Sequence, residues 1–199
     1  MANPATEMSK MDTNNLEITA SQKLESQRQQ YLTFSLDGEA YGVDILRVQE
    51  IKGWTPVTHI PNTPEYIRGI LNLRGTIVPI IDMRMRFNLQ RTEYTPVTVI
   101  IVLSVQTADG IHIIGIVVDA VSDVIDVMPD DIKPSPDFGE AVHTEFISGL
   151  AAMDKQMVML LNIDKMLSND ELSAIGTLRD YPVNESAAKP ADSNEPETI

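Results

Sequence analysis

The histidines are the first residues that could do chemistry, because imidazole serves both as a general base and as a metal ligand near neutral pH. The chain has three, His59, His112 and His143, and they lie far apart in the sequence. No two show the His-x-x-x-His spacing that places a pair of imidazoles on one face of a helix. We therefore interpret them as surface or hydrogen-bonded side chains. The chain has no cysteine, which excludes thiolate ligands, cysteine nucleophiles and disulfides.

An acidic cluster at Asp119, Asp123 and Asp126 is the next candidate, since carboxylates bind divalent cations. Its spacing lacks the glycine and the closing glutamate of a calcium loop. If the segment is a strand, Asp119 and Asp123 share one face and Asp126 points to the other. The sequence therefore predicts no metal site.

Nucleophile and phosphate motifs are also missing. Ser122 and Ser148 lack the Gly-x-Ser-x-Gly elbow of serine hydrolases. Gly69 and Gly75 lie six residues apart without the Lys-Ser/Thr of a phosphate loop. We therefore expect no catalytic residue and no cofactor, although a small enzyme with carboxylate chemistry that no motif reveals stays an alternative.

The charge restricts the class of partner. A net charge of −14 over 199 residues argues against nucleic acid, because phosphate binding needs a basic surface. No apolar run is long enough to span a membrane, and the first ten residues lack the apolar core of a secretory signal. We expect a cytoplasmic protein that does not insert into a membrane.

The charge is unevenly distributed along the chain. Residues 47–91 contain seven basic and three acidic residues, whereas residues 93–171 contain three basic and fourteen acidic ones. Such blocks are either solvated faces or two opposite faces that dock different protein surfaces. The sequence leaves both interpretations open.

Three regions are expected from composition. Residues 1–29 are polar and predict a flexible leader, and residues 177–199 predict a disordered tail, because they have too few apolar residues to offset the entropy of ordering. Residues 30–176 are the folded body, in which we find no simple internal repeat.

Strand signals dominate that body. Asp37-Gly38, Arg74-Gly75 and Asp109-Gly110 are turn pairs between apolar runs. Thr63-Pro64 predicts the start of a short helix, and residues 46–51 are compatible with a helical turn or a strand. We expect strands at residues 31–36, 41–45, 69–73, 76–81, 97–105, 111–119, 121–127 and 157–163.

A helix is expected at the C-terminal end of the body. Asp164 is its predicted cap, Ser168 and Glu171 have capping-box spacing, and Gly176 ends it. Many short strands with dense turns predict a mainly β barrel or sandwich.

Several motifs cover essentially the whole folded body: Tyr41-Gly42-Val43-Asp44-Ile45, Val48-Gln49-Glu50-Ile51, residues 66–82 (YIRGILNLRGTIVPIID), Gly115-Ile116-Val117-Val118-Asp119, Val121-Ser122-Asp123-Val124 and Asn162-Ile163-Asp164-Lys165. Together, and in this order, they resemble the CheW family of bacterial chemotaxis coupling proteins.

This resemblance implies two SH3-like five-stranded β-barrels packed over a shared apolar seam, with short helices. It also implies a non-catalytic adaptor that binds the cytoplasmic tips of methyl-accepting chemoreceptors and the regulatory domain of the histidine kinase CheA. Such an adaptor is recruited to receptor arrays at the inner face of the membrane.

The resemblance points to a receptor-binding set made of Val48, Glu50, Gly69, Arg74, Val99, Val121 and Val124. The four valines are equally compatible with a core position, since strand valines are usually buried. Our hypothesis is that some of them line a groove between the barrels that accepts a receptor helix.

Arg74 has three open interpretations: an internal pair with Glu50, a direct partner contact, or both. The alternative binding function is an SH3-like domain for proline-rich peptides, which needs an aromatic-lined groove. The single tryptophan, Trp54, precedes Thr55-Pro56, which predicts an exposed loop instead of such a groove.

Overall fold

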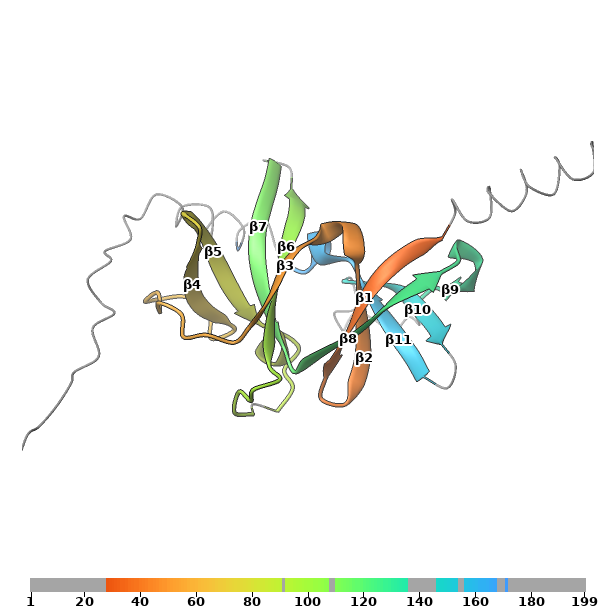
Figure 1. Cartoon of the computed structure of the whole chain (residues 1–199), viewed down its shortest axis with the longest axis horizontal. Helices are drawn as coiled ribbons and strands as arrows, with labels where there is room; N and C mark the ends of the chain where they lie inside the picture. The colour runs from red at the N-terminus through yellow and green to blue at the C-terminus, as the bar shows by residue number, and fades with distance from the viewer. Residues whose placement is uncertain are drawn as a thin grey trace, which may run out of the picture.

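The computed structural model describes residues 28–90, 92–107, 110–135, 146–153, 156–167 and 171. These residues form two lobes that lie side by side along the long axis, each built on one curled sheet (Figure 1). The predicted leader and tail lie outside the described residues, apart from residues 28 and 29. No described helix is long and apolar enough to cross a membrane.

The central lobe is formed by one continuous stretch of chain. Its five strands have the spatial order β3-β6-β7-β5-β4. The strands are β3 (Val48–Gly53), β4 (Ile67–Leu73), β5 (Thr76–Asp82), β6 (Val99–Thr107) and β7 (Gly110–Val118). A short helix, α2 (Met83–Arg86), follows β5 and is capped by the carboxylate of Asp82.

The terminal lobe combines the two ends of the described chain. Its six strands have the order β8-β1-β2-β11-β10-β9, and β9 has only two residues. The strands are β1 (Gln29–Leu36), β2 (Glu39–Asp44), β8 (Ala120–Val127), β9 (Ile132–Lys133), β10 (Ile147–Met153) and β11 (Gln156–Leu161). The mainly β, two-lobed fold that we predicted is confirmed, with this short sixth strand added to one lobe.

The two lobes have the same pairing pattern. In each, a parallel contact joins two antiparallel sets, β2 with β11 in the terminal lobe and β7 with β5 in the central lobe. Residues 66–69 (YIRG) and 146–149 (FISG) enter equivalent strands, and each glycine follows a register shift. Residues 48–51 (VQEI) and 121–124 (VSDV) are likewise equivalent.

The structure thus contains an internal repeat of strand pairing, which is compatible with the absence of a simple repeat period in the sequence. The repeat escapes a search for one period because the central lobe uses its strands in a different chain order from the terminal lobe. Few positions are identical between the lobes, since a strand needs only apolar side chains on its buried face.

Between its first and last described strands, the chain passes from one lobe to the other twice. The first crossing is the 3₁₀ turn η1 (Ile45–Arg47), between β2 and β3. The second is Asp119 alone, between β7 and β8. Each crossing leads directly into an edge strand (Figure 1).

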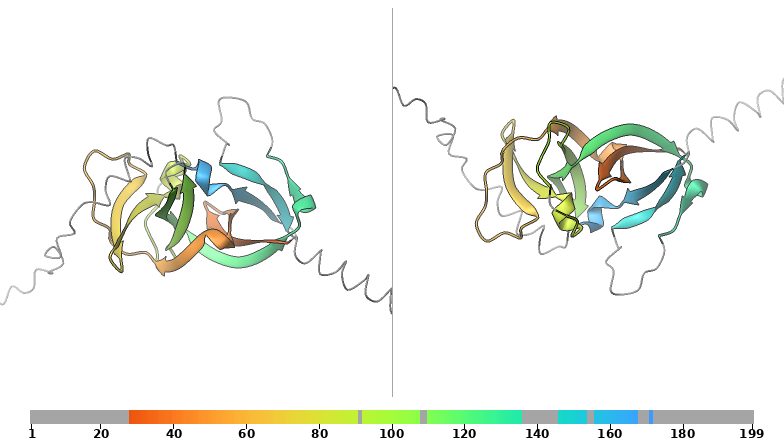
Figure 2. Two further views of the ribbon diagram at one scale, coloured as in Figure 1. Left: turned by 90° about the horizontal axis from the view of Figure 1, so that it is seen from above. Right: turned by 90° about the horizontal axis from the view of Figure 1, so that it is seen from below.

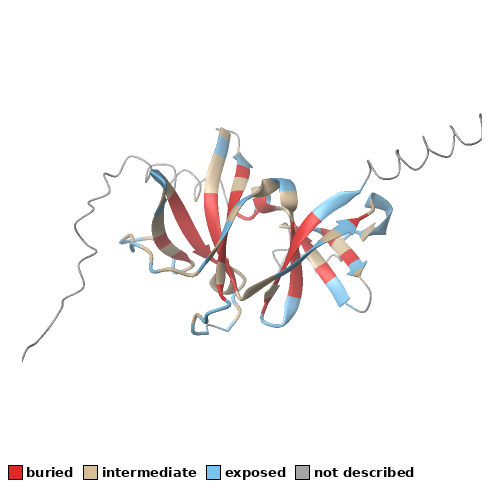
Figure 3. Cartoon of the chain, viewed as in Figure 1, coloured by how far each residue is buried: buried red, intermediate tan, exposed pale blue. Residues whose placement is uncertain are grey.

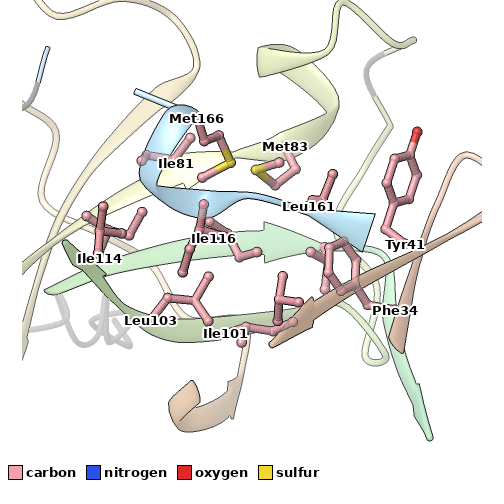
Figure 4. Packing of buried hydrophobic residues seen from close by; sticks show 14 of the residues in the cluster. Phe34, Tyr41, Ile81, Met83, Ile101, Leu103, Ile114, Ile116, Leu161 and Met166 are labelled. Carbon is pink, nitrogen blue, oxygen red and sulfur yellow. The ribbon is translucent and has the colours of Figure 1, made fainter. Parts of the chain in front are cut away.

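A shared apolar cluster joins the lobes. Phe34 and Leu161 of the terminal lobe lie in the same cluster as Met83 and Ile116 of the central lobe, and all are buried (Figure 4). Buried positions occur along the strands of both lobes (Figure 3). Each lobe also has a smaller apolar cluster of its own.

The predicted turns Asp37-Gly38 and Arg74-Gly75 are confirmed as two-residue hairpin turns. All four residues have positive φ, the combination of a type I′ turn that matches the strand twist. The sequence of residues 46–51 is compatible with a helical turn or a strand. In the structure, residues 46–47 belong to η1 and residues 48–51 to β3.

Two helix predictions are corrected. Residues 63–64 begin no helix, because the Thr63 hydroxyl donates to the Ile60 carbonyl and the chain turns directly into β4. Asp164 is not a cap: the turn η3 (Ile163–Lys165) is capped by Asn162, which leaves the Asp164 carboxylate for a longer-range contact.

The remainder of the predicted C-terminal helix lies outside the described residues, except for Glu171. The Glu171 carboxylate accepts a hydrogen bond from Tyr66 and lies 3.9 Å from Arg86.

Candidate protein-docking surface

Two edge strands, β3 of the central lobe and β8 of the terminal lobe, carry most of the predicted site residues. Among the described strands, each pairs on one side only, β3 with β6 and β8 with β1. Figure 2 shows both strands along the same side of the molecule. We refer to β3 and β8 as the docking strands.

Both docking strands contain a register shift at the same place. In β3 it lies between Val48 and Glu50, and in β8 it lies between Val121 and Val124. An extra residue in one strand brings side chains three positions apart onto one face. Val48 with Ile51, and Val121 with Val124, are therefore matched apolar pairs.

The predicted valines differ in burial. Val48, Val99 and Val121 are half-buried and pack against the cluster shared by the lobes. Val124 is 48% exposed, and its equivalent Ile51 is 43% exposed. Sequence reasoning missed Ile51, although its equivalence to Val124 within the two similar motifs was a signal that could have found it.

Arg74 and Glu50 lie close to each other. The Arg74 Nη2 atom is 3.8 Å from the Glu50 Oε2 atom, and the Arg74 side chain is 88% exposed. The turn that presents Arg74 is fixed locally, because the Gly75 N–H donates to the Asn72 side-chain oxygen at 2.8 Å. Arg74 is thus next to Glu50 while most of its guanidinium still faces solvent.

Gly69 has a different environment from the other predicted site residues. It is buried with φ of +139°, and a Cβ at this position would lie 2.1 Å from the Thr58 carbonyl oxygen. The Thr58 backbone exchanges hydrogen bonds with Ile70 beside it. The glycine is required for this close backbone approach, so any effect of Gly69 on binding is indirect.

The acidic cluster does not form a metal site. Asp119 binds Arg84, and Asp126 accepts a hydrogen bond from Gln30 at 2.9 Å. Among the residues that the structure describes, no three His, Cys, Asp or Glu side chains gather closely enough to hold a metal ion.

The surroundings of Asp119 lower the pKa of its carboxyl group. Burial alone would raise the pKa of its carboxyl group, but the bidentate hydrogen bonds from Arg84, at 2.6 and 2.7 Å, and the Asp37 N–H, at 2.8 Å, oppose it. The net result is a pKa below the ordinary value.

A hollow of about 660 Å³ lies on the central lobe, lined by Trp54, Arg68, Asp82, Thr92, Glu93 and Tyr94. Trp54 does not stand in an exposed loop as predicted: it is half-buried, with its ring centroid 4.0 Å from that of Tyr94. The buried Asp82 carboxylate accepts from the Tyr94 hydroxyl at 2.7 Å and from the Met85 N–H at 3.2 Å.

These contacts give the hollow a structural role. Burial, and then the bond to Asp82, raise the pKa of Tyr94, so its phenol stays neutral. Charged side chains also line the hollow, which makes it a poor match for the apolar aromatic groove that proline-rich peptides need.

Comparison with known proteins identifies the family. The model of the CheW-like domain matches residues 30–171, which span both lobes and both docking strands. The chain belongs to the CheW family. Its relatives in this family include the chemotaxis protein CheW of Klebsiella aerogenes, 46% identical over 147 residues, which cover 74% of this chain and 86% of that protein. The chemotaxis protein CheW of Rhizobium meliloti is 34% identical over 155 residues, with 78% and 97% covered.

A solved structure agrees with this assignment. The crystal structure of the scaffolding protein TtCheW from Thermoanaerobacter tengcongensis matches with a TM-score of 0.64 and 34% identity, covering 70% of this chain and 92% of that one. The predicted CheW family resemblance is confirmed. The chain is a member of a family of non-catalytic chemotaxis adaptors and scaffolds.

Proposed function

We propose that this CheW family member couples the cytoplasmic tips of methyl-accepting chemoreceptors to the regulatory domain of the histidine kinase CheA. Receptor state then controls kinase autophosphorylation through contacts alone. The protein works in the cytoplasm, recruited to receptor arrays at the inner face of the membrane, without inserting into it and without binding nucleic acid.

The observation that carries this proposal is the matched pair of docking strands. Each carries one half-buried and one exposed apolar side chain, Val48 with Ile51 and Val121 with Val124. The two strands lie along the same side of the molecule (Figure 2). A helix recognised through its apolar face needs such anchors at more than one point along its length. A receptor tip helix that lies across both strands would meet anchors from both lobes.

Arg74 and Glu50 supply polar contacts at the edge of this surface. The Arg74 guanidinium is planar and exposed, so it can bind a receptor carboxylate with two parallel hydrogen bonds. Glu50 holds the guanidinium on the β3 side of its turn. Val99 lies in β6 opposite Gly53 of β3 and packs against the shared cluster.

The kinase contact uses a surface other than the docking strands. The two lobes differ in their charge. The described residues of the terminal lobe, within 29–44 and 120–161, include seven acidic and one basic residue. The described residues of the central lobe, within 48–118, include four acidic and five basic ones. A contact made by the terminal lobe is therefore electrostatic in character, and a basic partner surface suits it.

Each contact can be small, below about 1,200 Å² in total. Receptor arrays hold many copies together, and the resulting effective concentration strengthens weak contacts.

Reconstitution tests the proposal. Kinase autophosphorylation is measured with receptor cytoplasmic fragments, with and without this chain. We expect kinase output to rise only when all three components are present, and the receptor-free mixture is the control. Unchanged kinase output on addition of the chain would refute the proposed coupling.

A further inference from the structure

The two crossings between the lobes are each held by an ion pair. At the second crossing, Arg84 of α2 binds both carboxylate oxygens of Asp119, with N–O distances of 2.6 and 2.7 Å. At the first crossing, the Nη2 atom of Arg47 lies 2.7 Å from the Oδ2 atom of Asp164. Neither pair is freely solvated: side-chain exposure is 14% and 29% for Arg84 and Asp119, and 32% and 28% for the other pair.

Both ion pairs also connect one lobe to the other. The Arg84 guanidinium reaches Asp37, in the β1–β2 turn of the terminal lobe, at 3.1 Å. The second carboxylate oxygen of Asp164, in the terminal lobe, accepts from the N–H of Gln106 in the central lobe at 2.7 Å. Each ion pair is thus part of a contact between lobes.

The two ion pairs occupy similar places in the internal repeat, with reversed polarity. Arg84 lies two residues after Asp82, the last residue of β5 and the cap of α2, and Asp164 lies two residues after Asn162, the cap that follows β11. Arg47 and Asp119, the partners at the crossings, are one position apart in the repeat. Arg84 lies beside a cap and binds an aspartate at a crossing. Asp164 lies beside a cap and binds an arginine at a crossing. An ion pair beside the cap at both crossings argues that this position is a feature of the fold.

The ion pairs can fix the relative orientation of the lobes, which the apolar contact between them leaves less defined. Hydrophobic contact between the lobes stabilises their association but has little directional preference. The bidentate Arg84–Asp119 pair requires a defined geometry, and at the other crossing the two oxygens of Asp164 accept from Arg47 and from the Gln106 N–H. Arg47 directly precedes Val48, and Asp119 is separated from Val121 by one residue. An ion pair at a crossing therefore fixes the start of a docking strand.

We propose that Arg47–Asp164 and Arg84–Asp119 fix the angle between the lobes and so hold the two docking strands in register for one shared partner. They are positioning residues and do not contact the partner. The effect on receptor binding rests on the proposed function, whereas the effect on lobe geometry does not.

Distances between spin labels test this geometry, and a chain without cysteine permits clean labelling. Cysteines at Ile111 and Met157, both exposed, report the distance between lobes. Cysteines at Val97 and Ile111 lie toward opposite ends of the β6–β7 hairpin and report the central lobe alone. The variants are Arg84→Met, Arg47→Met and both together.

The matched control is Arg68→Met. Arg68 is half-buried in β4, and its contacts with the Met85 sulfur at 3.9 Å and the Tyr94 ring at 5.9 Å both lie within the central lobe. Arg84→Lys retains the positive charge but loses the bidentate geometry. It is the milder variant to use if Arg84→Met does not fold.

We expect the distribution of distances between the labels on the two lobes to shift or broaden in Arg84→Met and Arg47→Met, and most in the double variant. The distance between the two labels within the central lobe should stay unchanged. Arg68→Met should leave both distances unchanged, and Arg84→Lys should fall between wild type and Arg84→Met. Affinity for a receptor fragment should fall roughly two- to tenfold, the cost of re-ordering one or two elements on binding.

An unchanged distribution between lobes in the double variant would overturn the inference, even if the receptor still binds. Failure of the wild-type chain to bind a receptor fragment would count against the proposed function alone, because the distances between labels are measured without a receptor.

Discussion

The guanidinium of Arg74 stands 3.8 Å from the carboxylate of Glu50, so a turn between β4 and β5 reaches the edge strand β3 of the same sheet. The two residues come from opposite ends of the strand order β3-β6-β7-β5-β4, and their contact reflects the curl of the sheet. Because Arg74 is 88% exposed, this contact orients the side chain more than it stabilises the fold.

Replacing Arg74 should separate binding from stability. We expect Arg74→Ala to change the free energy of unfolding by less than about 0.5 kcal/mol, as is usual for exposed positions, and to weaken receptor binding. Urea unfolding and a pull-down with receptor fragments measure the two effects. Arg74→Lys is the control for charge without a planar fork, and a large loss of stability in Arg74→Ala would show that the internal pair is the main role.

Val124 is the sharpest test of the docking strands, because it is the most exposed of the predicted valines. Val124→Lys should abolish receptor pull-down and leave the free energy of unfolding within about 0.5 kcal/mol of wild type. Val97→Lys, at another exposed valine, is the matched control and should bind normally. Val121→Lys should reduce both, since Val121 also packs against the shared cluster. Retained binding in Val124→Lys would remove β8 from the docking surface.

Gly69 should be intolerant of a side chain for a structural reason. Gly69→Ala places a Cβ against the Thr58 carbonyl and keeps a positive φ, so we expect a loss of roughly 1–3 kcal/mol in the free energy of unfolding. Gly53→Ala is the control, since a Cβ at Gly53 would have no neighbouring atom within 4 Å. Its stability should stay unchanged or rise slightly, and equal losses in the two variants would contradict the steric explanation.

The pKa of Asp119 predicts a response to acid. Because Arg84 and the Asp37 N–H hold the pKa of Asp119 below its unfolded value against the effect of burial, the contribution to stability is complete above an unfolded pKa of about 3.9. It is lost as the pH falls from there through the lower pKa of the folded state. Unfolding at neutral and acid pH should show Asp119→Asn less stable than wild type at neutral pH, with the difference shrinking in acid. A pH-independent difference would mean that ionisation of Asp119 does not stabilise the fold.

Salt should weaken the kinase contact. The described residues of the terminal lobe include seven acidic and one basic residue. The Debye length falls from roughly 10 Å at 0.1 M ionic strength to roughly 3 Å at 1 M. Titration calorimetry with the kinase regulatory domain at these two salt concentrations should give a weaker affinity at the higher one. A salt-independent affinity would exclude an electrostatic contact through this lobe.

Local signals predicted most of the strands. Alternating apolar residues and glycine turn pairs located β5, β6, β7 and β8 to within a few residues, because strand pairing across a tight turn depends on neighbouring residues. β10 was missed: its sequence, residues 147–153 (ISGLAAM), is rich in small residues and becomes a strand only between β9 and β11.

By itself, the sequence determined the family, the β-rich class, the hairpin turns and the set of valines that could face a partner. Only the tertiary structure decided which of those valines is exposed and which residues hold the crossings. Arg47 meets Asp164 across 117 residues and Arg84 meets Asp119 across 35. Such pairs depend on where the chain passes from one lobe to the other, and that path is set by the packing of two sheets over a shared core, which no local pattern of side chains specifies.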